Sequence, residues 1–125
     1  MQYLTIEHIL QMYALVLLRD GGAEGVRDVG RLEAVVATQH QMVFGEELYQ
    51  SAHQKAAAII RGIVGDHPFS DGNKRTAMLS GLTLLELNGY TFTAKQGELE
   101  DFAVDVAVKH YSVEEIARWL EAHSA

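Results

Sequence analysis

Apolar side chains recur at intervals of three or four residues along most of this chain, and that spacing is typical of packed helices. The chain has 125 residues, enough for one hydrophobic core but too few for two. Its only proline is Pro68, so proline interrupts a helix nowhere else. We therefore predict an all-α fold, with residues 1–125 forming one domain built as a compact bundle of about six helices.

Capping and stop signals place the ends of the predicted helices. The predicted segments run from Thr5 to Asp20, Asp28 to about Gln39, Ser51 to Val64, Lys74 to Leu87, Gly97 to Lys109, and from Ser112 onward with Glu115 completing a capping box. For the first helix, we expect an inner face of Ile9, Leu10, Tyr13, Leu17 and Leu18. The third helix is rich in alanine, which lets another helix approach closely, so we expect it to lie centrally.

The helical pattern breaks between His40 and Gln50. Within this stretch, Met42, Val43 and Phe44 favour a short extended segment. We expect a flap around residues 40–50 that forms an adaptable rim of the bundle.

Charge and composition exclude several classes of function. The formal charge is −7, and no basic stripe occurs beyond Lys74-Arg75, which disfavours direct binding of nucleic acid. The chain has no cysteine, which excludes disulfides and thiolate metal sites and is typical of a reducing compartment. No apolar run reaches the roughly 18 residues of a membrane span, and the first residues lack a signal-peptide pattern. We expect a soluble, cytoplasmic protein.

The stretch from His67 to Ala77 concentrates polar chemistry directly before the apolar run 78–87. A turn that leads into a helix offers free backbone N–H groups to an anion, above all to a phosphate. His67 precedes this turn and is suited to accept a proton from a hydroxyl. Asp71 is suited to hold the divalent cation that accompanies polyphosphates. The pattern indicates a phosphate site with an adjacent base.

A plainer interpretation of the same stretch is available. Asn73 is then only a helix cap, and Lys74 and Arg75 are only solvated charges. Two cations at the positive end of a helix are unfavourable unless an anion neutralises them, which favours the phosphate interpretation.

The literal string resembles the core motif of the Fic/Doc (Fido) superfamily, His-x-Phe-x-Asp/Glu-Gly-Asn-Gly-Arg-x-x-Arg. The matching positions are His67, Phe69, Asp71, Gly72, Asn73 and Arg75. The chain departs from the general pattern at Lys74, where the family has glycine, and at Met78, where it has a second arginine. Both departures are found in the Doc branch, the death-on-curing toxins. The resemblance extends upstream over residues 28–34 and implies the Fic/Doc fold.

The resemblance implies a role for each matching residue. His67 is the expected general base, Asp71 the expected Mg²⁺ ligand, and Phe69 an inward-pointing anchor of the loop. The expected nucleotide- and phosphate-binding residues are Gly72, Asn73, Lys74 and Arg75. We expect a positive φ at the glycine and a polar contact from the asparagine side chain to phosphate.

Lys74 determines the reaction that the resemblance implies. In the Doc branch, a lysine in this slot accompanies ATP bound in an inverted orientation, so that the γ-phosphate passes to a Ser/Thr hydroxyl of a protein. The expected target is the Tu-type translation elongation factor, whose phosphorylation arrests translation and growth. Met42, Val43 and Phe44 are expected to dock the target beside His67 by strand addition. The alternatives are Fic-type transfer of AMP (AMPylation) and a non-catalytic regulatory binding module.

The resemblance also predicts how the activity is controlled. Many Fic proteins carry an inhibitory helix with the string Ser/Thr-x-x-x-Glu-Gly/Asn, which this chain lacks. An inhibitor in trans is therefore expected. In Doc toxins it is the Phd-type antitoxin, whose disordered C-terminal segment folds on binding.

Overall fold

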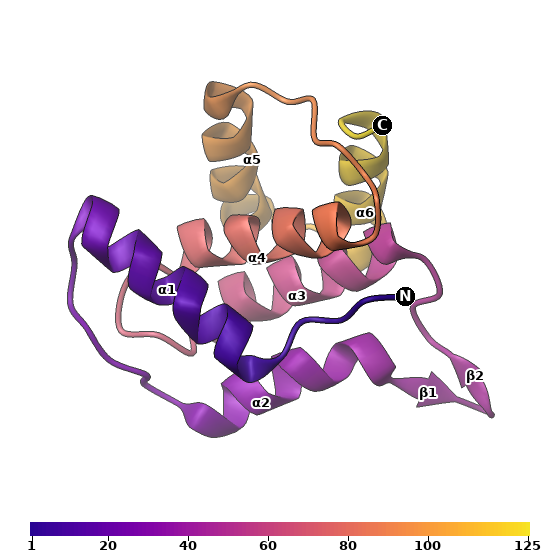
Figure 1. The fold of residues 1–125 in the computed structure, drawn as a ribbon, viewed down its shortest axis with the longest axis horizontal. Helices are drawn as coiled ribbons and strands as arrows, with labels where there is room; N and C mark the ends of the chain where they lie inside the picture. Colours follow the sequence, from indigo (N-terminus) through magenta and orange to yellow (C-terminus); the bar gives the residue numbers. More distant parts are fainter.

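Helices make up nearly all regular structure in the computed structural model, which describes residues 1–125 (Figure 1). They are α1 (Ile6–Asp20), α2 (Val29–Ala37), α3 (Ala52–Asp66), α4 (Asn73–Leu87), α5 (Gln96–Lys109) and α6 (Val113–Ala122), with a short 3-10 turn, η1 (Thr38–His40), after α2. The strands are β1 (Met42–Val43) and β2 (Glu46–Glu47). The predicted helical bundle is confirmed, and none of its helices has the length and apolar character needed to cross a bilayer.

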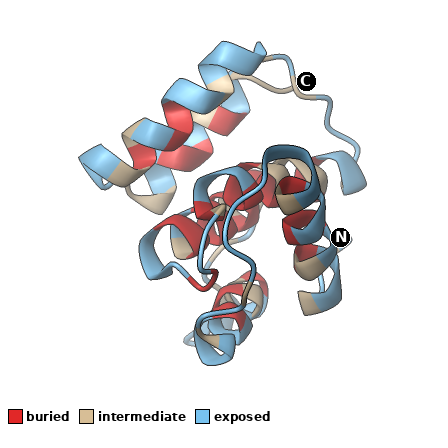
Figure 2. Ribbon diagram, turned by 90° about the vertical axis from the view of Figure 1, so that its left-hand side faces the viewer, coloured by how far each residue is buried: buried red, intermediate tan, exposed pale blue.

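The α3–α4 pair forms the centre of the bundle, with α1 and α5 packed on α4 and with α2 and α6 packed on α3 (Figure 1). The buried residues face one another between these helices, as Figure 2 shows. The central helices approach closely at Gly81 of α4, where a Cβ atom would lie 2.5 Å from Cδ1 of Ile60. The alanines predicted to allow this approach, Ala56 and Ala57 among them, are fully buried on α3.

Side-chain caps begin four of the helices at the predicted residues. The side chains of Thr5, Ser51 and Ser112 each accept a hydrogen bond from the backbone N–H three residues later in the chain. The side chain of that later residue accepts from the backbone N–H of the capping residue, which completes a capping box. Asp28 caps α2 by accepting from the N–H of Arg31 at 3.1 Å. These bonds satisfy helix N–H groups locally, which is why sequence alone locates them.

The inner face of α1 differs from the expected one. Met12 and Val16 are buried, whereas Leu18 is 85% exposed. Leu18 lies two positions beyond Val16, which turns it about 200° away from the core-facing side at 3.6 residues per turn. Leu15 is exposed as well, so α1 presents apolar side chains outward.

The predicted flap is a two-stranded hairpin. Met42 pairs with Glu47, and Phe44 and Gly45 turn the chain with φ of 51° and 80°. The hairpin is tied to α3 because the buried Lys55 ammonium bonds the Glu47 carboxylate at 3.0 Å and also donates to the carbonyl of Gln39.

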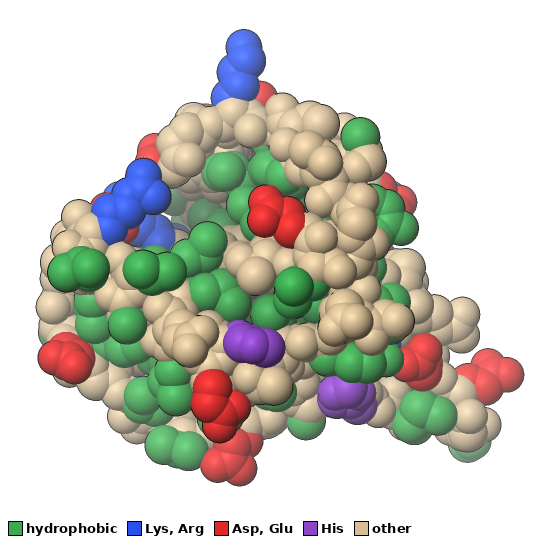
Figure 3. Space-filling model, viewed as in Figure 1, with side chains coloured by type: hydrophobic (Ala, Val, Ile, Leu, Met, Phe, Trp, Pro, Cys, Tyr) green, Lys and Arg blue, Asp and Glu red, His purple; other side chains and the backbone are tan.

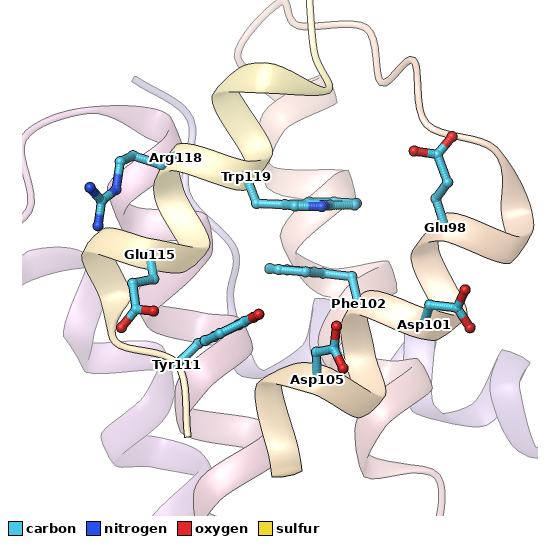
Figure 4. A pocket seen from close by; sticks show the side chains of 8 residues that line it. All are labelled: Glu98, Asp101, Phe102, Asp105, Tyr111, Glu115, Arg118 and Trp119. Atoms are coloured by element: carbon cyan, nitrogen blue, oxygen red, sulfur yellow. The ribbon is translucent and has the colours of Figure 1, made fainter. Parts of the chain in front are cut away.

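Helices α5 and α6 enclose an aromatic cluster in which the rings of Phe102 and Trp119 stack at 3.9 Å (Figure 4). A cavity of about 480 Å³ lies between these helices, with carboxylates such as Asp101 and Glu115 at its rim. No residue of the stretch from His67 to Ala77 lines it.

Candidate active site

His67 ends α3 and begins the loop that leads into α4. Its backbone is left-handed, with φ of 48°, and its N–H still donates to the carbonyl of Ile63 at 3.1 Å. The left-handed turn takes the chain off the helix axis, and the side chain remains exposed. His67 is therefore open to solvent at the start of the loop that leads into α4.

Asn73 holds this loop in shape from within. Its side-chain oxygen accepts from the N–H of Phe69 at 3.1 Å, and its side-chain amide donates to the carbonyl of Phe69 at 2.9 Å. Asn73 is buried and Phe69 fully so, and these two bonds satisfy the Phe69 peptide groups. The side chain of Asn73 is therefore engaged within the loop, while its backbone N–H makes no hydrogen bond.

Phe69 packs inward against α1, in the position expected of an anchor. Its ring stacks on Tyr13 with 4.0 Å between the centroids and 10° between the planes. The hydroxyl of Tyr13 accepts from the N–H of Gly25 at 2.8 Å. Tyr13 thus joins the motif loop to the segment that follows α1. The helical repeat of apolar residues had predicted only that Tyr13 lies in the core.

The entrance to α4 offers unpaired backbone donors. Gly72 precedes the helix with φ of 75°, the positive value expected for it, and it provides no side-chain cap. The first N–H to bond back is that of Thr76, which donates to the carbonyl of Gly72 at 2.9 Å. The N–H groups of Asn73, Lys74 and Arg75 donate to no other protein group. Such a helix end attracts anions.

Asp71 lies beside these donors. One carboxylate oxygen accepts from the N–H of Gly72 at 2.9 Å, and the residue is exposed. The other oxygen faces Gly22, where a Cβ atom would lie 2.8 Å away. No group of three or more His, Cys, Asp or Glu side chains is placed to hold a metal. A single carboxylate fits Mg²⁺ bound together with phosphate oxygens, because this ion keeps several waters and few protein ligands.

The two cations of the motif have different surroundings. Arg75 donates from Nη1 to Oδ1 of Asp20 at 2.6 Å, and this hydrogen bond, with the charge of Asp20, raises the arginine pKa. Lys74 is exposed and makes no ion pair. Both residues line one end of a groove of about 660 Å³ between α1, α4 and α5. Hydrophobic side chains gather over α1 and α4 on this face (Figure 3).

Residues 21–28, which connect α1 to α2, run alongside the motif loop. Val26 forms an antiparallel bridge with Phe69, the N–H of Ser70 donates to the carbonyl of Gly25 at 3.0 Å, and the N–H of Arg27 donates to the carbonyl of Pro68 at 2.7 Å. The segment is therefore an extended strip next to His67. Its glycines are the only sequence signal for such a strip, and they equally fit the helix stop that was predicted after Asp20.

The hairpin with Met42, Val43 and Phe44 lies at the wrong end of α3 for the expected docking role. It precedes the first turn of α3, whereas His67 follows the last, and Figure 1 shows the two ends far apart. A helix of 15 residues spans about 22 Å at 1.5 Å per residue. The expectation that these residues lie beside His67 is corrected: the segment that bonds the motif loop is residues 21–28.

The two central helices thus place a histidine at the end of α3 and unpaired N–H groups at the start of α4. The family model for the Fic/DOC family matches residues 3–85, and the chain belongs to that family. Two relatives place it in the Doc branch. It is 33% identical over 126 residues to "Toxin Doc" of Mycolicibacterium smegmatis, covering 99% of this chain and 95% of the relative. It is 32% identical over 117 residues to "Protein kinase doc" of Escherichia phage P1, covering 94% and 91%.

Proposed function

We propose that this protein is a Doc-type toxin that transfers the γ-phosphate of ATP to a Ser/Thr hydroxyl of a protein. The observation that carries the proposal is that the short loop beginning at the exposed His67 leads to three unpaired N–H groups at the start of α4. Both relatives support it, one named a toxin and the other a protein kinase.

In the proposed step, His67 accepts the proton of the target hydroxyl as its oxygen attacks the γ-phosphorus. The new oxygen–phosphorus bond forms while the bond to the β–γ bridging oxygen breaks, and ADP leaves. The free N–H groups of residues 73–75 are positioned to bind the phosphate oxygens, and Lys74 and Arg75 neutralise their charge. Asp71 would hold Mg²⁺ against the nucleotide, and the ion supplies further charge neutralisation when bound.

We place the target polypeptide along residues 25–27, the extended strip beside the motif loop. The inner edge of the strip is paired with residues 68–70, so an added strand would pair with its outer edge. We propose the Tu-type translation elongation factor as the target, so that the modification arrests translation and growth in the cytoplasm.

We propose further that an antitoxin of Phd type neutralises the protein in trans by occupying the groove between α1, α4 and α5. The groove is lined by exposed leucines, including Leu15 and Leu18, which suit the apolar face of a segment that folds on binding. Lys74 and Arg75 lie at the end of the same groove. A segment bound there would border the phosphate site.

The test is incubation with purified elongation factor Tu and ATP labelled at either the γ- or the α-phosphate. Phosphotransfer labels the target from the γ position only, whereas AMP transfer labels it from the α position only. The His67→Ala variant is expected to lose the label and the growth arrest. His110→Ala is a matched control, because His110 is also an exposed histidine in a left-handed helix cap, with φ of 53°. A His67→Ala protein that keeps full activity would refute the proposal.

A further inference from the structure

The ion pair between Asp20 and Arg75 joins the last residue of α1 to the first turn of α4. Each charge stands at the end of its helix where the dipole disfavours it, a carboxylate at a C-terminus and a guanidinium at an N-terminus. At 2.6 Å, their contact is the shortest ion pair in the structure. The two residues therefore neutralise each other in the absence of any other partner.

The pair holds the arginine on the groove side of α4. Asp20 and Arg75 both line the groove between α1, α4 and α5. His67, Asp71 and Gly72 do not line it. Arg75 nevertheless belongs to the first turn of α4, where the free amides are, so a phosphate bound at those amides would compete for a guanidinium that is already engaged by a carboxylate.

We propose that Asp20 is a positioning residue that lowers the affinity for nucleotide by competing with the phosphates for Arg75. The inference rests on the proposed function, since it concerns the same nucleotide site. A bound polyphosphate must draw one or more guanidinium donors from the Asp20 carboxylate, and that carboxylate repels the phosphate charge. Lys74, which has no ion-pair partner, meets the phosphates without this competition.

The experiment compares steady-state phosphotransfer by the wild type, Asp20→Asn and Asp20→Glu at varied concentrations of Mg²⁺ and ATP. Asparagine has the size of aspartate without its charge, and we expect KM for ATP to fall about three- to fivefold, the scale set by an exposed ion pair, with kcat changed less than twofold. Asp20→Glu keeps the charge and is expected to restore a KM near that of the wild type. Thermal melting of each variant checks that the fold is intact.

Glu100→Gln is the matched control, because Glu100 lines the same groove and acts on Arg75 only through space. We expect it to change KM by less than twofold. Binding of ATP to His67→Ala and to His67→Ala with Asp20→Asn, measured by calorimetry, gives the same comparison without turnover.

Two results overturn the inference while leaving the proposed function intact: an unchanged KM in Asp20→Asn, or a raised KM, which would mean that Asp20 orients the arginine for phosphate. If the wild type neither binds ATP nor transfers phosphate, the proposed function fails, and the inference fails with it. If Glu100→Gln lowers KM as much as Asp20→Asn does, the effect is one of net charge, and direct competition for Arg75 is refuted.

Discussion

Replacing Asn73 by alanine is expected to destabilise the protein more than any other single change in the motif loop. The variant removes both partners of the buried Phe69 peptide groups, whose N–H and carbonyl make no other hydrogen bond. A buried polar group left without a partner costs about 1–3 kcal/mol. Two such groups therefore predict a loss of about 2–6 kcal/mol in the free energy of unfolding.

The chain offers a matched control for this prediction in Asn88. Its side-chain oxygen accepts from the N–H of Gln2 at 2.8 Å and its amide donates to the carbonyl of Gln2 at 3.0 Å. These two bonds repeat those of Asn73 with Phe69, but the Gln2 peptide is exposed, so water replaces them. The substitution also removes the bond from the Asn88 amide to the carbonyl of Leu84 at 2.8 Å. Asn88→Ala is therefore expected to cost about 1 kcal/mol or less.

Urea unfolding followed by circular dichroism measures both variants, with equal m-values required for the comparison. At temperatures where Asn73→Ala is still folded, we also expect weaker binding of ATP, because Asn73 sets the shape of the loop before the phosphate-binding amides. If Asn73→Ala loses no more stability than Asn88→Ala, the reasoning from buried, unsatisfied peptide groups is wrong.

Three further predictions follow from the packing and the charges. Gly81→Ala places a Cβ atom 2.5 Å from Cδ1 of the buried Ile60 and is expected to cost about 1–3 kcal/mol in urea unfolding, whereas Gly97→Ala meets nothing within 4 Å and is expected to be neutral or stabilising. Burial lowers the pKa of His53 from 6.5, so the folded protein binds fewer protons than the unfolded chain below that value. Stability is therefore expected to fall as the pH drops below about 6.5, and less steeply in His53→Gln, by thermal melting across that range. Phe44 has a left-handed backbone conformation at an exposed turn, and Phe44→Gly is expected to raise Tm because glycine adopts that conformation without strain. Phosphotransfer is expected to stay unchanged, because the hairpin lies at the opposite end of α3 from His67. A large loss of activity would contradict the proposal that the target binds along residues 25–27 and not at the hairpin.

Much of the fold could be predicted because it rests on local signals. The caps at Thr5, Ser51 and Ser112 depend on residues three positions apart, and the cores of α3 and α4 on a repeat of three to four residues. The motif itself is contiguous, so its resemblance to the Fic/Doc family is visible in the amino-acid string alone. The error at Leu18 arose where the helical periodicity is ambiguous, at the end of a helix whose side chains are mostly apolar.

The amino-acid sequence by itself determined the helices, their caps and the family, because each of these depends on residues that are near one another in the chain. Only the tertiary structure decided which distant groups meet: Asp20 with Arg75, residues 21–28 with the motif loop, and the flap with the far end of α3. Those contacts depend on how α1 packs against α4 and α2 against α3. The apolar repeat of a helix shows which of its faces is buried, but it does not show which other helix covers that face.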